Sequence, residues 1–271
     1  MQQNRKNINT LVSIVTVVYN GESFLEETIK NVLSQTYPNM EYIIIDGGST
    51  DRTIDIIKKY DREIFFWVSE KDTGMYNALN KGFCVASGKI LTYLNSDDLY
   101  ADNDVIENVV RFFKKTQADL VFGNTAYIDQ YQNYLYSYKA VKLPKKAIKY
   151  LQRVPFAQPS AFWTKELFQH IGGFDENLKL AADKKFFLQA LLHPKFKYKK
   201  IDKTISKFRL HKDRLSATMQ DLMKQERLYI DRELNFKKLF LPKLLVEGYI
   251  KTINFQNIIQ KKRQEWTKKI R

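Results

Sequence analysis

The chain contains few of the residues that mark disulfide-bonded, collagen-like or membrane-spanning proteins. Its 271 residues include a single cysteine, Cys84, with 6 prolines and 10 glycines. One cysteine excludes an internal disulfide framework and is typical of a protein in the reducing cytosol. No apolar run in the sequence approaches the roughly 20 residues that cross a bilayer. The chain is instead 44% hydrophobic, which is enough to bury one large core, or a core with an appended helical segment.

Three short apolar runs each end in a cluster of polar or acidic residues. The runs are Val12–Val18, Tyr42–Ile45 and Ile90–Leu94, and the clusters that follow them are Tyr19–Glu22, Asp46–Asp51 and Asn95–Asp98. Short runs rich in β-branched residues predict buried strands, and helix-periodic apolar residues follow the first two clusters. Strand, polar turn and helix therefore alternate, which predicts a parallel sheet with all three clusters at one edge.

The third cluster predicts a cation site. Open α/β sheets bind ligands at the carboxyl ends of their strands, and Asp97 and Asp98 come directly after the third run. Hard cations such as Mg²⁺ and Mn²⁺ prefer carboxylate oxygens and bridge them to phosphate oxygens. We therefore expect these two residues to form half of a site that a metal-bound diphosphate completes. The alternative is a solvated turn or a helix N-cap, because another helical pattern follows.

Four ordered motifs carry a resemblance to a known family. They are Thr-Val-Val-Tyr-Asn at 16–20, Asp-Gly-Gly-Ser-Thr-Asp at 46–51, the segment Glu70–Gly82 and Leu-Asn-Ser-Asp-Asp at 94–98. With these motifs the chain resembles the inverting family 2 glycosyltransferases, and within them the bacterial branch that builds capsule, colanic-acid and O-antigen sugars. The resemblance implies a GT-A fold, an α/β fold with a Rossmann-like, mostly parallel central sheet flanked by helices. It also implies a nucleotide-sugar donor and a divalent cation, Mn²⁺ or Mg²⁺.

The resemblance assigns donor-binding roles to residues of the first three motifs. The residues expected to contact the nucleoside, the diphosphate or the sugar are Thr16, Tyr19, Asn20, Asp72, Asn77 and Asn80. The first three belong to the nucleoside side, and the last three to the diphosphate and sugar side. Asp46 is expected to accept a hydrogen bond from the base, most simply from the N3–H of uracil. The alternatives are structural: Asp46 or Asp51 could cap the helix that begins near Thr53, and Asn80 could bond its own loop.

The fourth motif departs from the usual pattern of the family. Where many relatives carry Asp-x-Asp, this chain has Asn95-Ser96-Asp97, so the first position offers a neutral amide. We expect Asp97 to contact the cation directly, Asp98 to be a second ligand or an orienting group, and Asn95 and Ser96 to face the donor. Phosphate oxygens and water can complete a six-coordinate shell, so the missing carboxylate is expected to weaken cation binding and not to abolish it.

A sugar transferase also needs a base that takes the proton of the acceptor hydroxyl as this hydroxyl attacks. The segments Gly172–Asn177 and Ala181–Phe187 resemble the family's Gly-Gly-Phe-Asp-Glu segment and the catalytic element at the start of the next helix. This resemblance assigns the base to Asp183. The alternative role for Asp183 is N-terminal helix capping, which the helix dipole favours without any catalysis.

In this family a Gly-Gly-Ser segment usually closes over the diphosphate, and it is missing here. Phe208-Arg209-Leu210-His211 occupies the region. Arg209 and His211 are therefore candidates for neutralising the diphosphate, with Arg214 as a further candidate. His170 and His193 belong to no partner pattern and are interpreted as structural or surface residues.

Charge divides the chain into an acidic and a basic half. Residues 1–138 carry 13 Lys and Arg against 18 Asp and Glu, whereas residues 139–271 carry 32 against 12. An anionic membrane leaflet attracts such clusters by roughly 1 kcal/mol per nearby basic side chain. Residues 216–271 also mix lysines with apolar and aromatic residues at helical spacing, which is typical of a basic amphipathic helix in a membrane interface. The alternative is a helical pair that packs against the catalytic domain with a solvated basic face.

The preferred interpretation divides the chain into three parts. Residues 1–125 are the nucleotide-sugar-binding half of the GT-A domain, residues 126–215 the half that binds the acceptor and carries the base, and residues 216–271 a C-terminal helical extension. The expected function is metal-dependent transfer of a sugar, from a UDP-sugar by preference, to a lipid-linked or growing surface-polysaccharide acceptor. This places the protein in the cytoplasm, at the inner face of the plasma membrane.

Two other functions remain as alternatives. A sugar nucleotidyltransferase shares the alternating α/β pattern, but its Gly-rich, Arg-containing first loop is absent, because Tyr19–Glu22 occupies that place. The pI of about 9.6 and the lysine clusters suggest a nucleic-acid-binding protein. No zinc-finger, RRM or homeodomain signature supports that function, so no nucleic-acid partner is expected.

Overall fold

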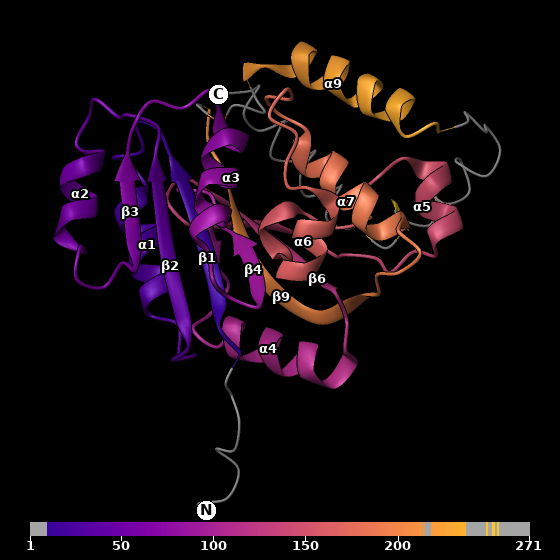
Figure 1. The fold of residues 1–271 in the computed structure, drawn as a ribbon, viewed down its shortest axis with the longest axis horizontal. Helices are drawn as coiled ribbons and strands as arrows, with labels where there is room; N and C mark the ends of the chain where they lie inside the picture. The colour runs from indigo at the N-terminus through magenta and orange to yellow at the C-terminus, as the bar shows by residue number, and fades with distance from the viewer. Residues whose placement is uncertain are drawn as a thin grey trace, which may run out of the picture.

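The computed structural model describes residues 10–212, 214 and 218–236, together with residues 248, 251, 252 and 254. These residues form one sheet of nine strands with helices packed against it (Figure 1). In chain order the strands are β1 (Val12–Val18), β2 (Met40–Asp46), β3 (Phe66–Ser69), β4 (Ile90–Tyr93), β5 (Leu99–Tyr100), β6 (Leu120–Asp129), β7 (Tyr134–Tyr138), β8 (Ala161–Thr164) and β9 (Tyr198–Leu210). The helices are α1 (Leu25–Leu33), α2 (Thr53–Lys59), α3 (Met75–Val85), α4 (Val105–Thr116), α5 (Lys145–Leu151), the 3₁₀ helix η1 (Gln158–Ser160), α6 (Lys165–Ile171), α7 (Ala182–Leu192) and α9 (Gln220–Glu233).

The sheet is mostly parallel. Its strand order is β3-β2-β1-β4-β8-β6-β9-β5, and β7 pairs with β6 off this path. The pairs β1–β2, β1–β4, β2–β3 and β6–β9 are parallel. β8 runs antiparallel to both β4 and β6, so β6 and β9 regain the direction of β1. The expected α/β fold of GT-A type, with a mostly parallel central sheet flanked by helices, is confirmed.

Both faces of the sheet are covered, which explains why the strands read as nearly continuous apolar runs. In β1, Val15 and Val17 belong to a core shared with α3, α6 and α7, while Ile14 and Val18 belong to a second core shared with α1, α2 and α4. Successive strand residues point to opposite faces, so a strand buried on both sides needs apolar residues at every position.

The three polar clusters lie at one edge of the sheet, as expected. Val18 is the register partner of Asp46, and Val15 is the partner of Tyr93, so β1, β2 and β4 end side by side. The strand β5 then follows Asp98 directly and pairs with β9, which the sequence pattern did not predict. This pairing brings the end of β9 to the third cluster.

The described part of the C-terminal extension packs against the catalytic half. Helix α9 lies alongside α7 (Figure 1), and its Ile230 is 0% exposed in the core that α3, α6 and α7 share. The rest of the expected amphipathic tail, at 216–217, 237–247, 249–250, 253 and 255–271, lies outside the described residues. The boundary expected after residue 125 falls inside β6, so the two halves share one sheet. Within the described ranges, no helix has the length and apolarity to span a membrane.

Candidate active site

Asn20 ties the first two loops of the sheet edge together. Its backbone is in the left-handed region, with φ of 51°, which asparagine tolerates better than most residues. Its Oδ1 accepts a hydrogen bond from the N–H of Thr50 at 2.9 Å, and its own N–H donates to Ser49 Oγ at 2.7 Å. Tyr19 beside it is 65% exposed. The loop is therefore rigid at Asn20 and presents the ring of Tyr19 to a ligand.

Thr16 does not reach this edge. Its side chain is 0% exposed within β1. Its hydroxyl donates to the carbonyl of Leu94 at 2.8 Å and accepts from the Tyr42 hydroxyl at 3.1 Å. The expected contact of Thr16 with the nucleoside is therefore corrected: this hydroxyl is buried and links β1 to the neighbouring strands.

Asp46 is buried at the end of β2 and is used by its own loop. Its carboxylate is 0% exposed and accepts hydrogen bonds from Gly48 N at 3.1 Å, Ser49 N at 2.9 Å and Ser69 Oγ at 2.6 Å, as well as from Ser49 Oγ. Three of these four donors share Oδ2 and one binds Oδ1, and the burial of the whole side chain closes it to a base in this structure. Asp46 also does not cap α2, because the N–H of Thr53 donates to Asp51 Oδ1 at 3.0 Å. The expected direct contact of Asp46 with the base is thus corrected to a role in shaping the loop.

The carboxylate that is partly exposed at this point belongs to Asp72. A Cβ atom added to Gly47 would lie 2.6 Å from Asp72 Oδ2, so this carboxylate lies directly over the backbone that follows β2. Its Oδ1 accepts the N–H of Gly74 at 2.8 Å, which fixes the orientation of the group. Asp72, which was expected on the diphosphate and sugar side, therefore lies against the loop after Asp46.

Asn77 and Asn80 of α3 hold the loop that leads to the expected base. Asn77 Nδ2 donates to Glu176 at 2.8 Å, and Asn80 Nδ2 donates to the carbonyl of Phe174 at 2.8 Å. Asn80 Oδ1 accepts the N–H of Phe174 at 3.0 Å. The amide of Asn80 is engaged at both ends, so its expected donor contact is corrected to structural bonds between α3 and the 174–176 loop. Asn77 bonds the same loop through Nδ2 only, and its contact with the donor stays a prediction.

The third loop, Asn95–Asp98, is a tight turn whose last carboxylate is buried. Asp98 is 1% exposed, and its Oδ1 accepts the N–H of Arg209 at 3.0 Å. Burial, and then the neighbouring Asp97, raises the pKa of Asp98 well above its usual range. The carbonyl of Ser96 accepts a hydrogen bond from the Thr28 hydroxyl at 2.9 Å. Asp98 thus has the position of a group that orients the turn, one of the two roles expected for it.

Arg209 is buried beneath this loop. Its side chain is 1% exposed. Nε donates to the carbonyl of Asp97 at 2.8 Å, Nη1 to the carbonyl of Gln130 at 3.1 Å and Nη2 to Glu27 at 2.7 Å, while the ring of Phe24 lies 4.8 Å from Cζ. The expectation that Arg209 neutralises phosphate is therefore corrected, because every guanidinium nitrogen is already engaged within the protein.

Asp97 of the third loop lies beside His211, the residue that follows β9. Asp97 Oδ2 lies 2.8 Å from His211 Nε2, and the two side chains are 24% and 10% exposed. Asn95 Oδ1 beside them is buried with no hydrogen-bond partner among the described residues. Across the described ranges no three His, Cys, Asp or Glu side chains converge on one point. Asp97 and His211 are therefore a pair of neighbouring side chains at this loop and not part of a larger cluster of such groups within the described ranges.

Asp183 lies in the first turn of α7 and does not cap it. The N-cap residue is Ala181, which makes no side-chain capping bond. Asp183 Oδ1 accepts the Tyr76 hydroxyl at 3.1 Å and the N–H of Lys184 at 2.7 Å. Burial raises the pKa of Asp183 above the usual range of an aspartate. Asp183 is thus not the N-cap residue, but its bond to the Lys184 N–H satisfies a donor of the first turn, so the alternative of helix stabilisation stays beside the expected role as base.

Tyr93 is a buried residue next to the third loop whose hydroxyl senses the charge of Asp183. This residue ends β4, is 1% exposed and lies next to Leu94 and the third loop. Burial raises the pKa of the Tyr93 hydroxyl, and the charges of Asp183 and, more weakly, Asp98 raise it further. Both carboxylates therefore disfavour ionisation of the Tyr93 hydroxyl.

Sequence reasoning missed three residues that the structure adds to the site. They are Tyr76, which bonds Asp183, Glu27, which pairs with Arg209, and Glu226 of α9, which bonds the segment before Asp183. Tyr76 stands inside the Glu70–Gly82 motif and could have been found there. Glu27 and Glu226 carry no such signal, because their partners lie far away in the sequence.

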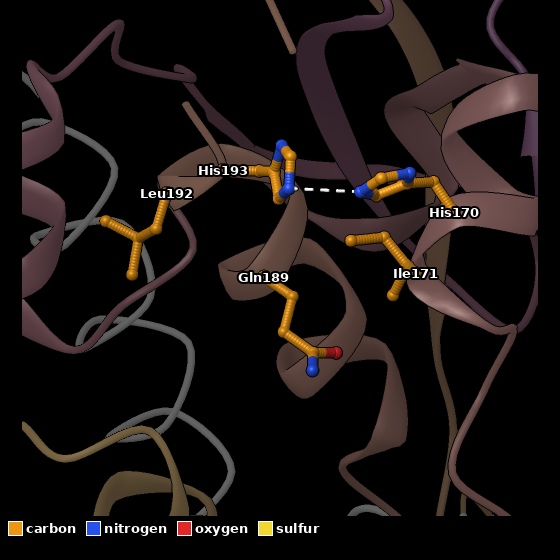
Figure 2. A pocket seen from close by; sticks show the side chains of 5 residues that line it. All are labelled: His170, Ile171, Gln189, Leu192 and His193. Atoms are coloured by element: carbon orange, nitrogen blue, oxygen red, sulfur yellow. Dashed lines mark hydrogen bonds between the residues drawn. The ribbon is translucent and has the colours of Figure 1, made fainter. Parts of the chain in front are cut away.

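A separate cavity lies between the ends of α6 and α7. It measures about 420 Å³ and is lined by His170, Ile171, Gln189, Leu192 and His193 (Figure 2). The Nε2 atoms of the two imidazoles face each other at 3.1 Å, and His193 Nδ1 accepts the N–H of Lys195 at 3.2 Å. An accepting Nδ1 leaves the proton of a neutral imidazole on Nε2, so His193 donates to His170. Desolvation lowers the pKa of His193, in keeping with a neutral ring. The pair is a structural bridge between two helices, as interpreted from the sequence.

The chain belongs to glycosyltransferase family 2. The model of this family, described as Glycosyl transferase family 2, matches residues 13–173, which include the three loops at the sheet edge. An uncharacterized glycosyltransferase of Mycobacterium tuberculosis is 31% identical over 190 residues, which cover 67% of this chain and 69% of that relative. The protein is thus a glycosyltransferase, and the nucleotidyltransferase and nucleic-acid-binding alternatives are set aside.

Solved structures share the fold. TarS from S. aureus, residues 1–349 in complex with UDP-GlcNAc, superimposes with a TM-score of 0.64 at 18% identity and covers 92% of this chain and 72% of that chain. The mannosyltransferase PcManGT from Pyrobaculum calidifontis, in complex with GDP-Man and Mn²⁺, gives a TM-score of 0.61 at 18% identity with the same coverage. The residues after 173, among them Asp183 and His211, lie beyond the family match but within a fold of this kind.

Proposed function

We propose that this chain transfers a sugar from a nucleoside diphosphate sugar to a hydroxyl group of an acceptor, with inversion at the anomeric carbon. One observation carries the proposal: the sheet edge holds Asp97 beside His211, and the carboxylate of Asp183 accepts the Tyr76 hydroxyl in the first turn of α3, the helix that follows the Asp72 loop. Such a transfer needs charge neutralisation for the departing diphosphate and a base for the attacking hydroxyl. The two groups at this edge match these needs.

We assign recognition of the donor base to Asp72. Asp46 uses its carboxylate oxygens within its own loop, whereas the Asp72 carboxylate is partly exposed over Gly47 at the end of β2. A carboxylate is a strong acceptor for the imide N–H of uracil, and the exposed ring of Tyr19 offers a surface for stacking. A UDP-sugar is the proposed donor. The complexes of TarS with UDP-GlcNAc and of PcManGT with GDP-Man support a nucleoside diphosphate sugar as the class.

The third loop fits a divalent cation. Asp97 Oδ2 and His211 Nε2 face each other, and the buried Asn95 Oδ1 has no hydrogen-bond partner among the described residues. Asp97 and His211 would hold Mn²⁺ or Mg²⁺, with oxygens of the diphosphate completing the shell. When bound, the cation neutralises the charge that grows on the departing nucleoside diphosphate. His211, a candidate for phosphate contact, is thereby reassigned to the cation, while Asp98 and Arg209 hold the loop from below.

Asp183 is the proposed base. Its carboxylate takes the proton of the acceptor hydroxyl while that oxygen bonds to the anomeric carbon and the bond from this carbon to the diphosphate oxygen breaks. The single displacement inverts the configuration. The raised pKa makes Asp183 a stronger base than an exposed aspartate, and the Tyr76 hydroxyl holds Oδ1 in place, so the orientation of the carboxylate is set before substrate binds.

We further propose that the acceptor is a lipid-linked or growing surface polysaccharide, such as a capsule or O-antigen chain, at the cytoplasmic face of the plasma membrane. The support is electrostatic. Residues 139–271 carry 32 Lys and Arg against 12 Asp and Glu, and α5 alone contains Lys145, Lys146 and Lys149. Basic surfaces of this kind are attracted to anionic lipid headgroups and to lipid-linked diphosphates.

A screen of nucleotide sugars tests the proposal. Each donor, and each free nucleoside diphosphate, is added with Mn²⁺, with Mg²⁺ or with a chelator, and the melting temperature and the release of nucleoside diphosphate are measured. At 100 times its Kd, a ligand adds about 2.7 kcal/mol of stability, which corresponds to about 5 to 11 °C for a chain of this size. We expect cation-dependent stabilisation by UDP and by one UDP-sugar. If no nucleotide raises the melting temperature under any of these conditions, the proposal is wrong.

A further inference from the structure

We propose that Glu226, on helix α9, is a positioning residue that holds the segment carrying Asp183. The inference rests on the proposed function, because it takes Asp183 as the base. Glu226 is 7% exposed. One of its carboxylate oxygens accepts the N–H of Lys179 at 2.6 Å, and the other accepts the N–H of Leu180 at 2.9 Å. Hydrogen bonds to an ionised carboxylate are about twice as strong as neutral ones.

These two N–H groups lie where the chain enters α7. The helix begins at Ala182, and its N-cap residue Ala181 offers no side chain to fix the entry. Glu226 supplies from another helix the anchoring that a capping side chain would give. Asp183 follows Leu180 by three residues, so a shift at the anchored N–H groups moves the carboxylate of Asp183 directly.

The rest of the inner face of α9 holds the same segment after Asp183. Lys184 pairs with Asp231 at 2.8 Å, and Lys185 pairs with Glu233 at 2.6 Å. Ile230, one turn after Glu226, is 0% exposed in the core. Figure 1 shows α9 lying next to α7. The helix thus contacts the chain on both sides of Asp183, although α9 lies beyond the residues that match the family model.

Among the contacts that α9 makes around Asp183, those of Glu226 are expected to matter most. The ion pairs of Asp231 and Glu233 are partly exposed, with side-chain exposures of 24% and 37%, and such pairs contribute about 0 to 1 kcal/mol. Glu226 is buried, and packing alone would be better served by an apolar side chain, since a buried charge is costly unless its bonds are made. Its two bonds on adjacent N–H groups instead define the position of the backbone.

The test compares Glu226→Gln with Asp221→Asn. Glu226→Gln keeps the size of the side chain but turns one accepting oxygen into an NH₂ group that faces an N–H donor. Asp221→Asn removes the same charge from an exposed position in the first turn of α9. A misplacement of about 1 Å can cost about 100-fold in rate, so we expect kcat of Glu226→Gln to fall by about 10- to 100-fold. The donor KM and the thermal shift with UDP stay unchanged, and Asp221→Asn stays at the wild-type rate.

A double variant separates positioning from general destabilisation. If Glu226 acts through Asp183, adding Glu226→Gln to Asp183→Asn lowers kcat no further, because the lost interaction is the same one. If the fold-loss of kcat in the double variant equals the product of the two single losses, the inference is overturned. Should Glu226→Gln fail to fold, Glu226→Asp, which is one methylene shorter, replaces it, with an intermediate loss of kcat expected and a wild-type kcat contradicting the inference.

The outcomes distinguish this inference from the proposed function. A wild-type kcat for Asp183→Asn means that the proposed base is wrong. A strongly reduced kcat for Asp183→Asn, together with equal rates for Glu226→Gln and Asp221→Asn, leaves the base intact and rejects the role of Glu226.

Discussion

Replacing Arg209 by methionine removes the most extensively bonded charge at the site. The guanidinium donates to the carbonyls of Asp97 and Gln130 at 2.8 and 3.1 Å and to Glu27 at 2.7 Å. Methionine fills most of the same volume but leaves all three acceptors without their donor. The change therefore isolates the hydrogen bonds and the charge from the packing.

The magnitude follows from burial. Removing one partner of a buried ion pair costs about 3 to 5 kcal/mol. Arg209 is 1% exposed but Glu27 is 33% exposed, so water reaches Glu27 after the substitution, and we expect the lower limit of about 3 kcal/mol. At about 2 to 4 °C per kcal/mol for a chain of this size, the melting temperature falls by about 6 to 12 °C.

The matched control is Arg52→Met. Arg52 forms the same kind of ion pair, with Glu22 at 3.2 Å, but its side chain is 81% exposed, so its loss costs at most about 1 kcal/mol. Thermal and urea unfolding of both variants give the comparison. Arg209→Met should also need more Mn²⁺ for half-maximal activity, because the carbonyl of Asp97 loses its anchor. Equal losses of stability in the two variants would refute the reasoning.

Three further predictions concern the ligands and the base. Asp97→Ala or His211→Ala is expected to remove the stabilisation that Mn²⁺ adds to UDP binding, and a cation effect that survives in both variants would reject this half-site. Asp72→Asn is expected to raise the donor KM about 10-fold or more with little change in melting temperature, as for a lost charged hydrogen bond of about 1.5 to 3 kcal/mol. Asp46→Asn is expected to lower the melting temperature more than it changes the donor KM. If Asp46→Asn raises the donor KM and Asp72→Asn lowers the melting temperature, the base contact belongs to Asp46. Burial raises the folded pKa of Asp183, so its ionisation opposes folding increasingly as the pH rises above the unfolded value of about 3.9. Asp183→Asn should therefore raise the melting temperature at pH 7 while kcat falls about 100-fold, and a lower melting temperature would contradict this account of its pKa.

The order of strands and loops could be predicted because it depends on local patterns. A strand covered on both faces must be apolar at nearly every position, so β1, β2 and β4 stand out as short apolar runs. In parallel neighbours the carboxyl ends meet at one edge, so Asp97 and the clusters after Val18 and Ile45 were placed together correctly. The family, and the GT-A fold that it implies, were predicted from the resemblance that these motifs carry, and the family match agrees with it.

The use of each polar side chain could not be predicted in the same way. A carboxylate or amide near a loop can face a ligand or satisfy the protein's own backbone, and which of these occurs depends on segments that fold beside it. The carboxylate of Asp46 accepts hydrogen bonds from the backbone of Gly48 and Ser49. The carboxylate of Asp72 instead lies above Gly47, where it is partly exposed. No pattern within the loop distinguishes these two carboxylates.

The sequence by itself determined the class of fold and the edge of the sheet at which the three polar clusters meet, and it predicted, through the family resemblance, Asp97 and Asp183 for the proposed chemistry. The tertiary structure alone decided which residues hold them. Arg209 reaches the carbonyl of Asp97 across 112 positions of sequence, and Glu226 reaches Leu180 across 46. Such bonds form because buried polar groups must find partners wherever the packed chain supplies them, and their partners are set by the packing of β9 against β5 and of α9 against α7.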